Sequence, residues 1–269
     1  MTMKYHICVV LLLSFFCVTT GFARTKVIAH RGYWKKDGSA QNSITSLIEA
    51  DKIKAFGSEC DIWITTDHKM IVTHDSKLPK DGKMYEIATS SYDDLKGALL
   101  SNGKTLPTLD DYLTVGKQCK HTKLILELKT HPSKELSLLL AKQVLEKVKA
   151  YKLKKKVEYI AFSIDIAKEI IRLDPKAKVH YLNGELSPKE LKQMGFAGLD
   201  YHINVYKKNP DWIDEAHKLG LKVNVWTVND DETMRFFIEK GADYITTDEP
   251  EQLQLLLINR PIDGYRVTD

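Results

Sequence analysis

Short runs of β-branched and other apolar residues alternate along the chain with longer segments in which apolar residues recur every three or four positions. The short runs are typical of buried strands and the longer segments of amphipathic helices, so the pattern predicts repeated strand–helix units around a parallel sheet. The predicted strands are eight in number and cover residues 26–30, 58–64, 123–129, 157–163, 178–182, 198–203, 222–228 and 243–247.

A helical pattern follows each predicted strand, and several of these patterns begin with a residue that can cap the free amides of a first turn. Ser187 is followed by Pro188 and then by Glu190, which is a capping box with proline at the first helical position. Eight strand–helix units predict an α/β fold of the (β/α)8 TIM barrel type, with a doubly wound open sheet as the alternative. The predicted helices begin near Ser43, Thr108, Ser133, Asp165, Ser187, Asn209, Asp230 and Glu249.

The segment from Met70 to Gly103 interrupts this alternation. It contains a short apolar run, turns with glycine and lysine, and a brief helical pattern near residues 92–100. Since it falls between the second strand and the next helix, where barrels carry functional loops, we expect a small insertion of about residues 75–104 over one end of the barrel. No Ser/Gly-rich linker or internal repeat divides the rest, so residues 24–269 are predicted to form one domain.

The N-terminal residues have a different composition from the rest of the chain. Lys4 precedes an apolar stretch from Ile7 to Val18, and small residues follow, including Gly21 and Ala23. This layout is typical of a secretory signal peptide, residues 1–23, cleaved after Ala23. The stretch is short for the roughly 20 residues of a membrane span, and the bulky residues before Cys17 disfavour a lipoprotein signal. We therefore expect export to the periplasm or the medium, without stable membrane insertion of the mature chain.

Charge and cysteine content narrow the class of protein. The 40 basic and 36 acidic side chains give a net charge of +4 and form no long block of one sign, so nucleic acid is not an expected partner. After the predicted signal peptide only Cys60 and Cys119 remain, too few for a disulfide framework. Both are expected to be small buried apolar residues.

An acidic cluster is predicted on the second and third strands. Glu59 and Asp61 are two positions apart and point to the same face of their strand, while Glu127 interrupts an otherwise apolar strand. Three buried carboxylates without a sulfur ligand favour one hard divalent cation, Mg²⁺ or Ca²⁺. The alternative is a salt-bridge network in which Arg31 and Lys129 neutralise the acids.

Two histidines stand at the ends of short apolar runs, His30 at the end of the first predicted strand and His74 after the run that begins at Met70, and would share the mouth of the barrel with these acids. Since an imidazole ordinarily titrates near neutrality, histidines suit the roles of general base and general acid, and His30 and His74 could take these roles on opposite sides of a phosphorus atom. Arg31, beside the first histidine, carries a fork of donors suited to phosphate oxygens. The alternative for either histidine is a structural role at the end of a strand.

These candidates lie within a series of short motifs that extends over nearly the whole chain. The motifs are His30-Arg31-Gly32, Asn42-Ser43, Glu59-Cys60-Asp61-Ile62, Thr65-Thr66-Asp67, Val72-Thr73-His74-Asp75, Pro107-Thr108-Leu109, Glu127-Leu128-Lys129, Phe162-Ser163, Trp226-Thr227-Val228-Asn229 and Gly241-Ala242-Asp243-Tyr244-Ile245-Thr246-Thr247-Asp248-Glu249-Pro250. In this order they resemble the glycerophosphodiester phosphodiesterase family, within the superfamily of barrels that includes phosphatidylinositol-cleaving enzymes.

The resemblance implies a (β/α)8 barrel with one divalent cation and a glycerophosphodiester substrate. It also implies roles for particular residues: metal ligands Glu59, Asp61 and Glu127; acid and base His30 and His74; phosphate contacts Arg31 and Lys129; and Trp226 as an apolar wall for the alcohol part of the substrate. From the pattern alone Trp226 would be a residue of the barrel core. The implied reaction is in-line displacement that yields an alcohol and glycerol 3-phosphate, by direct attack of water or through a cyclic phosphate.

The chain departs from the family pattern at one visible position. Where the family usually has Pro-Glu-Asn, this sequence reads Ala40-Gln41-Asn42, so Gln41 keeps a carbonyl oxygen but loses a negative charge. Substrate preference is therefore the property expected to differ. Two other functions are open: a lipid-directed enzyme of the same superfamily, which the mostly polar insertion disfavours, and a phosphate-binding barrel without turnover, which the full set of candidate residues disfavours. The sequence leaves the oligomeric state open.

Overall fold

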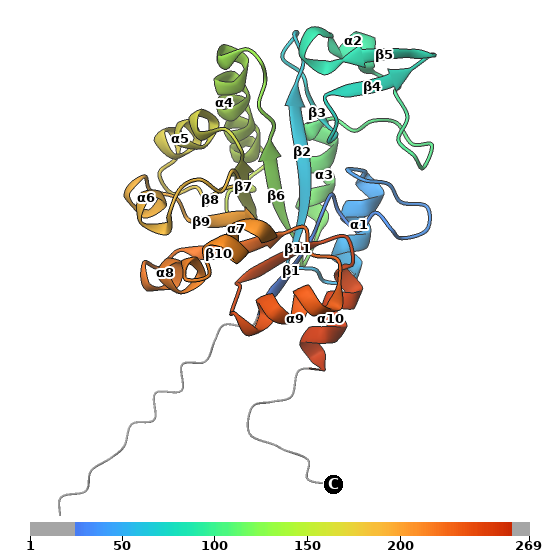
Figure 1. The fold of residues 1–269 in the computed structure, drawn as a ribbon. Coiled ribbons are helices and arrows are strands. Elements are labelled where there is room, and N and C mark those ends of the chain that lie inside the picture. Colours follow the sequence, from blue (N-terminus) through green and yellow to red (C-terminus); the bar gives the residue numbers. More distant parts are fainter. Residues whose placement is uncertain (1–24, 260–269) are drawn as a thin grey trace, which may run out of the picture.

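The computed structural model describes residues 25–259, so the predicted signal peptide and Cys17 lie outside the described residues. The described chain forms a closed barrel of parallel strands surrounded by helices (Figure 1). The barrel closes because β1 (Lys26–Ala29) pairs with both β2 (Gly57–Ile64) and β11 (Tyr244–Thr247). An open sheet would have two edge strands with one neighbour each, but the pairing of β1 with β2 joins the two ends of the strand order, so the predicted TIM barrel is confirmed and the doubly wound sheet is excluded.

All eight predicted barrel strands are present and each pairs in parallel with the next along the chain. The remaining five are β6 (Lys123–Leu128), β7 (Val157–Ala161), β8 (Val179–Tyr181), β9 (Gly198–His202) and β10 (Lys222–Trp226). The prediction of a strand over residues 157–163 was too long by two residues. Ser163 instead caps the next helix, where its side chain accepts a hydrogen bond from the amide of Ile166.

The helices form the outer ring of the barrel. They are α1 (Ile44–Lys52), α3 (Leu109–Gln118), α4 (Lys134–Ala150), α5 (Ile164–Leu173), α6 (Pro188–Gln193), α8 (Trp212–Lys218), α9 (Asp231–Glu239) and α10 (Pro250–Ile258). Five predicted cap residues accept hydrogen bonds from first-turn amides: Ser43, Thr108, Ser133, Ser187 and Asp230. The short helix α7 (Ile203–Lys208) was not predicted, because apolar Ile203 continues the strand pattern of β9.

The predicted insertion lies between β2 and α3, at the carboxyl end of β2 (Figure 1). It comprises β3 (Met70–Val72), β4 (Lys77–Lys80), β5 (Lys83–Glu86), η1 (Ile87–Thr89) and α2 (Tyr92–Leu95). β3 pairs antiparallel with β2, and a separate apolar cluster that includes Trp63, Ile71, Leu78 and Ile87 holds the insertion on the barrel. The β4–β5 hairpin was not predicted, since its lysines obscure the alternation of a strand.

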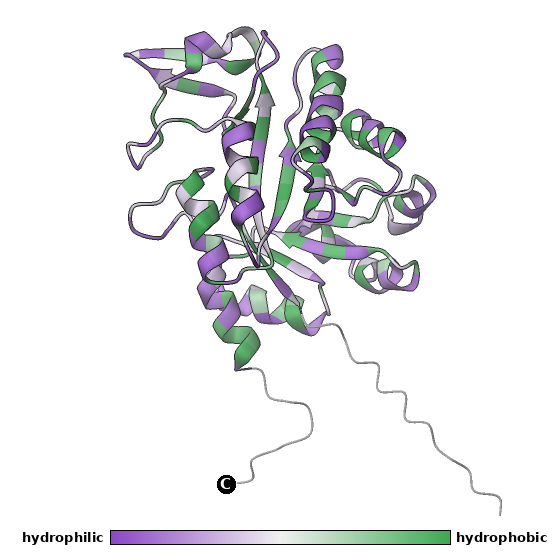
Figure 2. Cartoon of the chain, turned by 180° about the vertical axis from the view of Figure 1, so that it is seen from behind, coloured by the Kyte–Doolittle hydropathy of each residue, from purple (hydrophilic) through white to green (hydrophobic). Residues whose placement is uncertain are grey.

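Side chains on the barrel strands alternate between the helix layer and the barrel interior. Leu124, Leu126 and Leu128 of β6 pack into the main apolar core under the helices, whereas Glu127 between them faces the interior. The helices of the outer ring carry both hydrophobic and hydrophilic segments, as expected of helices with one face on the barrel (Figure 2). Cys60 and Cys119 are buried and free, as predicted. Among residues 25–259, no helix has the length and apolar character needed to cross a membrane.

Candidate active site

A pocket of about 140 Å³ opens at the carboxyl ends of the barrel strands. The pocket is lined by His30, Arg31, Glu59, His74, Glu127, Lys129, Ile160, Phe162, Leu182, Asp200, Trp226, Thr227 and Thr246. Seven of the eight predicted site residues therefore line one pocket, and the eighth, Asp61, lies beside it among the buried acids.

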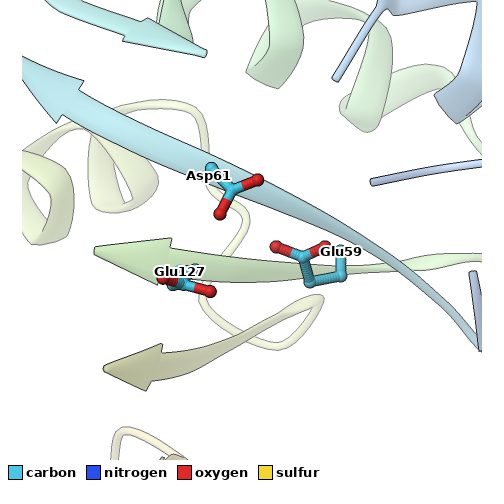
Figure 3. Close-up of side chains that lie close together, drawn as sticks. All are labelled: Glu59, Asp61 and Glu127. Carbon is cyan, nitrogen blue, oxygen red and sulfur yellow. The ribbon is translucent and has the colours of Figure 1, made fainter. Parts of the chain in front are cut away.

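The three predicted metal ligands converge on one side of the pocket. β2 and β6 pair in a register that sets Asp61 beside Glu127, and Glu59 lies two residues earlier on the same face of β2. One ligand atom from each acid lies within 4.8 Å of the others, and all three residues are buried (Figure 3). This arrangement offers one face of oxygen ligands to a hard cation.

The acids are not fully compensated by the protein. Burial, followed by the charges of Asp61 and Glu127, raises the pKa of Glu59 well above its ordinary value. Burial and the charge of Asp61 likewise raise the pKa of Glu127 to about 7, although Lys129 opposes the shift. Within residues 25–259 the buried Oε1 atom of Glu59 has no hydrogen-bond partner. An unpaired buried carboxylate oxygen is costly, so the acids fit a divalent cation better than a closed salt-bridge network.

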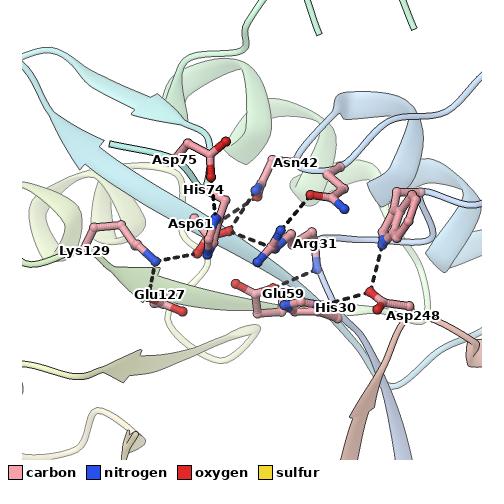
Figure 4. Close-up of polar contacts among 12 residues, drawn as sticks. His30, Arg31, Asn42, Glu59, Asp61, His74, Asp75, Glu127, Lys129 and Asp248 are labelled. Atoms are coloured by element: carbon pink, nitrogen blue, oxygen red, sulfur yellow. Dashed lines mark hydrogen bonds and ion pairs between the residues drawn. The ribbon is translucent and has the colours of Figure 1, made fainter. Parts of the chain in front are cut away.

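Two basic side chains border the acids (Figure 4). Lys129 Nζ lies 2.7 Å from Glu127 Oε1 and 3.2 Å from Asp61 Oδ1. Arg31 Nε lies 3.8 Å from Asp61 Oδ2, and the backbone amide of Arg31 donates to Glu59 Oε2 at 2.7 Å. The salt-bridge network considered from the sequence is thus partly present, but it leaves Glu59 Oε1 free to bind a ligand.

Residues of the first loop orient Arg31 and Asp61. Gln41 Oε1 accepts a hydrogen bond from Arg31 Nη1 at 2.7 Å, so the position that departs from the family pattern directly holds the predicted phosphate ligand. Asn42 donates from Nδ2 to Asp61 Oδ2 at 2.8 Å and accepts from the Asp61 amide at 3.0 Å. Asn42 has a φ of 59°, a left-handed conformation that asparagine tolerates better than most residues. These contacts fix the loop against the acidic strand.

His30 is oriented by an acid that received no role from the sequence. His30 Nδ1 lies 2.9 Å from Asp248 Oδ1, which also accepts from Trp34 Nε1 at 2.9 Å (Figure 4). Asn229 Nδ2 donates to the other carboxylate oxygen at 2.7 Å. With Nδ1 engaged by Asp248, Nε2 is the ring nitrogen left for the pocket. Asp248 belongs to the last motif of the series, residues 241–250. Its partner His30 lies 218 residues away, so nothing in the sequence around Asp248 identifies this contact.

His74 has a more exposed environment. Its Nδ1 lies 2.8 Å from Asp75 Oδ1, and the two side chains are 40% and 79% exposed. The contact is consistent with an orienting role of Asp75 toward His74. Because Asp75 is so exposed, its charge is screened by solvent, and we expect it to hold His74 less firmly than Asp248 holds His30.

Replacement of Asp248 by asparagine is expected to lower kcat by about 10- to 100-fold. The asparagine keeps the size of the side chain but removes the charge that favours one tautomer of His30 and stabilises its protonated ring. Steady-state kinetics would measure the change, with Asp75→Asn as the matched control that we expect to change kcat by only a few fold. A kcat within twofold of the wild type for Asp248→Asn would contradict the orienting role.

The same contacts make Asp248 a source of pH-dependent stability. Burial raises its pKa, but hydrogen bonds from His30, Trp34 and Asn229 outweigh burial and lower the pKa to about 2. Because the folded pKa lies below the ordinary value, ionised Asp248 stabilises the fold above about pH 4, and this contribution of about 2 kcal/mol is lost as pH falls toward 2. In acid denaturation the free energy of unfolding of the Asp248→Asn protein should therefore fall less between about pH 4 and pH 2 than that of the wild type.

The remaining wall of the pocket is largely apolar. Ile160, Leu182 and Trp226 form its wall, and Phe162 meets Trp226 edge to face with ring centroids 5.6 Å apart. The indole of Trp226 is held in place because its Nε1 donates to the backbone oxygen of Asp200 at 2.8 Å. Trp226 thus lines the pocket rather than filling the core, as its predicted contact with the alcohol requires.

Comparisons with known proteins agree with this geometry. A model of the glycerophosphoryl diester phosphodiesterase family matches residues 30–252. The crystal structure of a glycerophosphodiester phosphodiesterase from Parabacteroides distasonis is 50% identical, with a TM-score of 0.85 over 89% of this chain and 99% of that chain. A glycerophosphodiester phosphodiesterase of Caldanaerobacter subterraneus subsp. tengcongensis is 26% identical over 86% of this chain and 96% of its own. A phosphodiesterase of Oleispira antarctica, solved with the product sn-glycerol-3-phosphate, has the same fold, with a TM-score of 0.73, 24% identity and coverage of 87% and 97%.

Proposed function

Because this chain belongs to the glycerophosphoryl diester phosphodiesterase family, we propose that it hydrolyses glycerophosphodiesters to an alcohol and glycerol 3-phosphate with the aid of one divalent cation. The chain is a phosphoric diester hydrolase, as the family and its relatives show. One observation carries the finer proposal: three buried acids converge in a pocket that also contains two basic side chains and two histidines.

Glu59, Asp61 and Glu127 would hold the cation. Their oxygen ligands favour a hard cation such as Mg²⁺ or Ca²⁺. The free Oε1 atom of Glu59 and the raised pKa values of Glu59 and Glu127 support this assignment, since a nearby cation would offset both costs. When bound, the cation would supply positive charge to the oxygens of the phosphate.

The surrounding side chains would perform the remaining steps. Arg31 and Lys129 would bind the non-bridging phosphate oxygens and balance the charge that develops on them. One of the two histidines would take a proton from the attacking hydroxyl, and the other would donate a proton to the departing alcohol. Both line the pocket and both have Nδ1 engaged by a carboxylate, so Nε2 is the atom that we expect to move the proton.

Gln41 gives a first test of the phosphate contact. In a Gln41→Glu protein a carboxylate would face Arg31 Nη1, form an ion pair with it and compete with the substrate phosphate. We expect KM for a glycerophosphodiester to rise by about 3- to 10-fold with little change in kcat. Gln118→Glu, at an exposed position, is the matched control. An unchanged KM would show that Arg31 does not bind the ground-state phosphate.

The decisive experiment is a panel of glycerophosphodiesters assayed with and without added Mg²⁺ or Ca²⁺. We expect hydrolysis only with metal and glycerol 3-phosphate as the final product, and early time points would reveal any cyclic phosphate. Turnover of a lysophospholipid but not of soluble diesters would instead favour the lipid-directed function. Full activity in excess chelator would contradict the role of the cation.

We also propose that the N-terminal residues direct export and are then removed. The support is the order of a basic residue, a short apolar stretch and small residues before position 24. N-terminal sequencing of protein recovered from the periplasm or the medium should begin at Arg24. Mature protein that retains Met1 would contradict cleavage.

A further inference from the structure

Asp200 is a buried acid at the pocket to which neither the sequence nor the proposed reaction gives a role. It lies on β9 between Leu199 and Tyr201, both part of the outer apolar core, so its side chain points into the barrel. It is 2% exposed and it lines the pocket. Within the described residues it forms no ion pair, and its Oδ1 atom has no hydrogen-bond partner.

The position of Asp200 is opposite the proposed metal ligands. β9 and β10 carry it next to Asn224, whose amide donates to Thr246 Oγ1 at 2.9 Å, and Thr246 also lines the pocket. The apolar wall formed by Ile160, Leu182 and Trp226 lines the same pocket. The pocket therefore combines apolar walls with a carboxyl group whose Oδ1 atom has no partner, a surface that matches a short carbon chain carrying hydroxyl groups.

We propose that Asp200 determines specificity by accepting a hydrogen bond from a hydroxyl group of the glycerol moiety of the substrate. The inference rests on the proposed function, in which the phosphate is held on the opposite side by Arg31 and Lys129. A substrate anchored there would extend its glycerol carbons along the apolar wall toward Asp200. Its hydroxyl would satisfy the free oxygen, and an analogue without that hydroxyl would leave a buried acceptor unpaired.

A hydroxyl group fits this carboxyl better than the ammonium group of an alcohol such as choline. Burial raises the pKa of Asp200 to about 7, although His180 and a hydrogen bond with Asn224 oppose the rise, so burial disfavours the full negative charge that would attract an ammonium group. A carboxyl that is partly protonated can both accept from and donate to a hydroxyl. Trp226 and Phe162 meet edge to face and do not form a cage of several ring faces around one point.

The test compares two substrates with the same choline group. Glycerophosphocholine carries both glycerol hydroxyls. The 2-hydroxypropyl ester of phosphocholine lacks only the terminal hydroxyl and keeps the one next to the ester carbon, so a cyclic phosphate can still form from it. We expect the wild type with Mg²⁺ or Ca²⁺ to prefer the glycerol compound in kcat/KM by at least about 10-fold. Asp200→Leu and Asp200→Ala should reduce this preference to near one, with the rate on the hydroxypropyl compound little changed. Asp200→Asn, which keeps an acceptor oxygen, should retain most of it.

Glu158→Gln is the matched control for loss of a buried acid. Glu158 faces the barrel interior from β7, but it pairs with Lys123 and His180 and does not line the pocket in the described chain. This variant should keep the wild-type preference. Thermal unfolding of every variant would establish that each is folded, and Asp200→Asn supplies a readout if the apolar variants fail to fold.

Three outcomes would overturn the inference. If the wild type is active but Asp200→Ala and Asp200→Leu keep its preference, Asp200 does not contact the glycerol and the proposed function stands. If Asp200→Leu instead loses a preference for glycerophosphocholine over the glycerol ethyl diester, the carboxylate binds the ammonium group. If the wild type hydrolyses none of these diesters with metal, the proposed function fails, and the inference fails with it.

Discussion

His30→Ala is expected to lower kcat by about 100- to 10,000-fold while the protein remains folded. The ring lies at the carboxyl end of β1, lines the pocket and is held through Nδ1 by Asp248. Its removal takes away one proton-transfer group but leaves the acidic cluster and the phosphate ligands in place. Steady-state kinetics on a glycerophosphodiester would measure the loss, and thermal unfolding would show that Tm changes by only a few degrees.

The same experiment can assign the two histidines to their separate roles. A substrate that releases p-nitrophenol needs little help from a general acid, because its leaving group is already weakly basic. The variant of the histidine that acts as general acid should therefore recover most of its lost rate on such a substrate. The variant of the general base should not, and comparing His30→Ala with His74→Ala on both substrates would identify each.

His121→Ala is the control for these variants, since His121 is exposed and precedes the amino end of β6, whereas the pocket opens at the carboxyl ends of the strands. It should have wild-type kcat. Loss of either His30 or His74 should remove most of the activity. The variant that lacks both should be little slower than the slower of the two single variants, because both histidines act in one step. A His30→Ala protein with near-normal turnover would show that the acid–base assignment is wrong.

Removal of the divalent cation is expected to reduce activity by at least about 1,000-fold, with recovery on addition of Mg²⁺ or Ca²⁺. Metal should also raise Tm, because only the folded chain brings Glu59, Asp61 and Glu127 together. Glu59→Gln should abolish both responses. The amide can still accept the hydrogen bond from the backbone of Arg31, so the variant is expected to fold.

The stability of metal-free protein provides a second, independent readout. Glu59 is a buried acid with a free oxygen beside two other carboxylates, so Glu59→Gln should raise the free energy of unfolding in chelator by about 1–2 kcal/mol. Glu158 is also buried, but the bonds from His180 and Lys123 overcome the effect of burial and lower its pKa to about 2. Glu158→Gln should therefore lower stability and keep the response to metal.

The opposite expected changes in the free energy of unfolding distinguish a metal site at Glu59 from an ordinary buried ion pair at Glu158. Chemical denaturation in chelator and in excess metal, carried out on the wild type and both variants, would measure them. If Glu59→Gln destabilised metal-free protein by as much as Glu158→Gln, the carboxylate of Glu59 would be a structural partner of Arg31. Metal binding by these acids would then need another explanation.

The sequence by itself determined the architecture and most of the candidate site. Short apolar runs that alternate with segments of helical periodicity identified every barrel strand. A strand of a parallel sheet is buried on both faces, and this burial requires a nearly continuous run of apolar residues. The two-residue period of a strand placed Glu59 and Asp61 on one face, and the barrel interior is where the structure has them. The motif series added the family, which the matching family model confirms over residues 30–252.

Local elements with weak or mixed signals were not determined in this way. The β4–β5 hairpin carries lysines on both strands, and α7 begins at an apolar residue that continues the pattern of β9. In both places contacts with distant segments stabilise the structure: the hairpin packs on the apolar cluster around Trp63, and Tyr206 of α7 donates a hydrogen bond to the backbone oxygen of Asn224 in β10. Propensity within a short window cannot include such contacts.

Only the tertiary structure decided which polar groups have partners. Asp248 reaches His30 because β1 pairs with β11 when the barrel closes, which joins residues 218 positions apart. Gln41 reaches Arg31 because the loop between β1 and α1 folds back on itself, and Asp200 faces the barrel interior without an ion-pair partner in the described chain. A strand pattern states which way a side chain points, but the closed barrel sets the distance between charges on different strands. Those distances and the burial around them establish whether an acid is neutralised, orients a histidine or is free to bind a ligand.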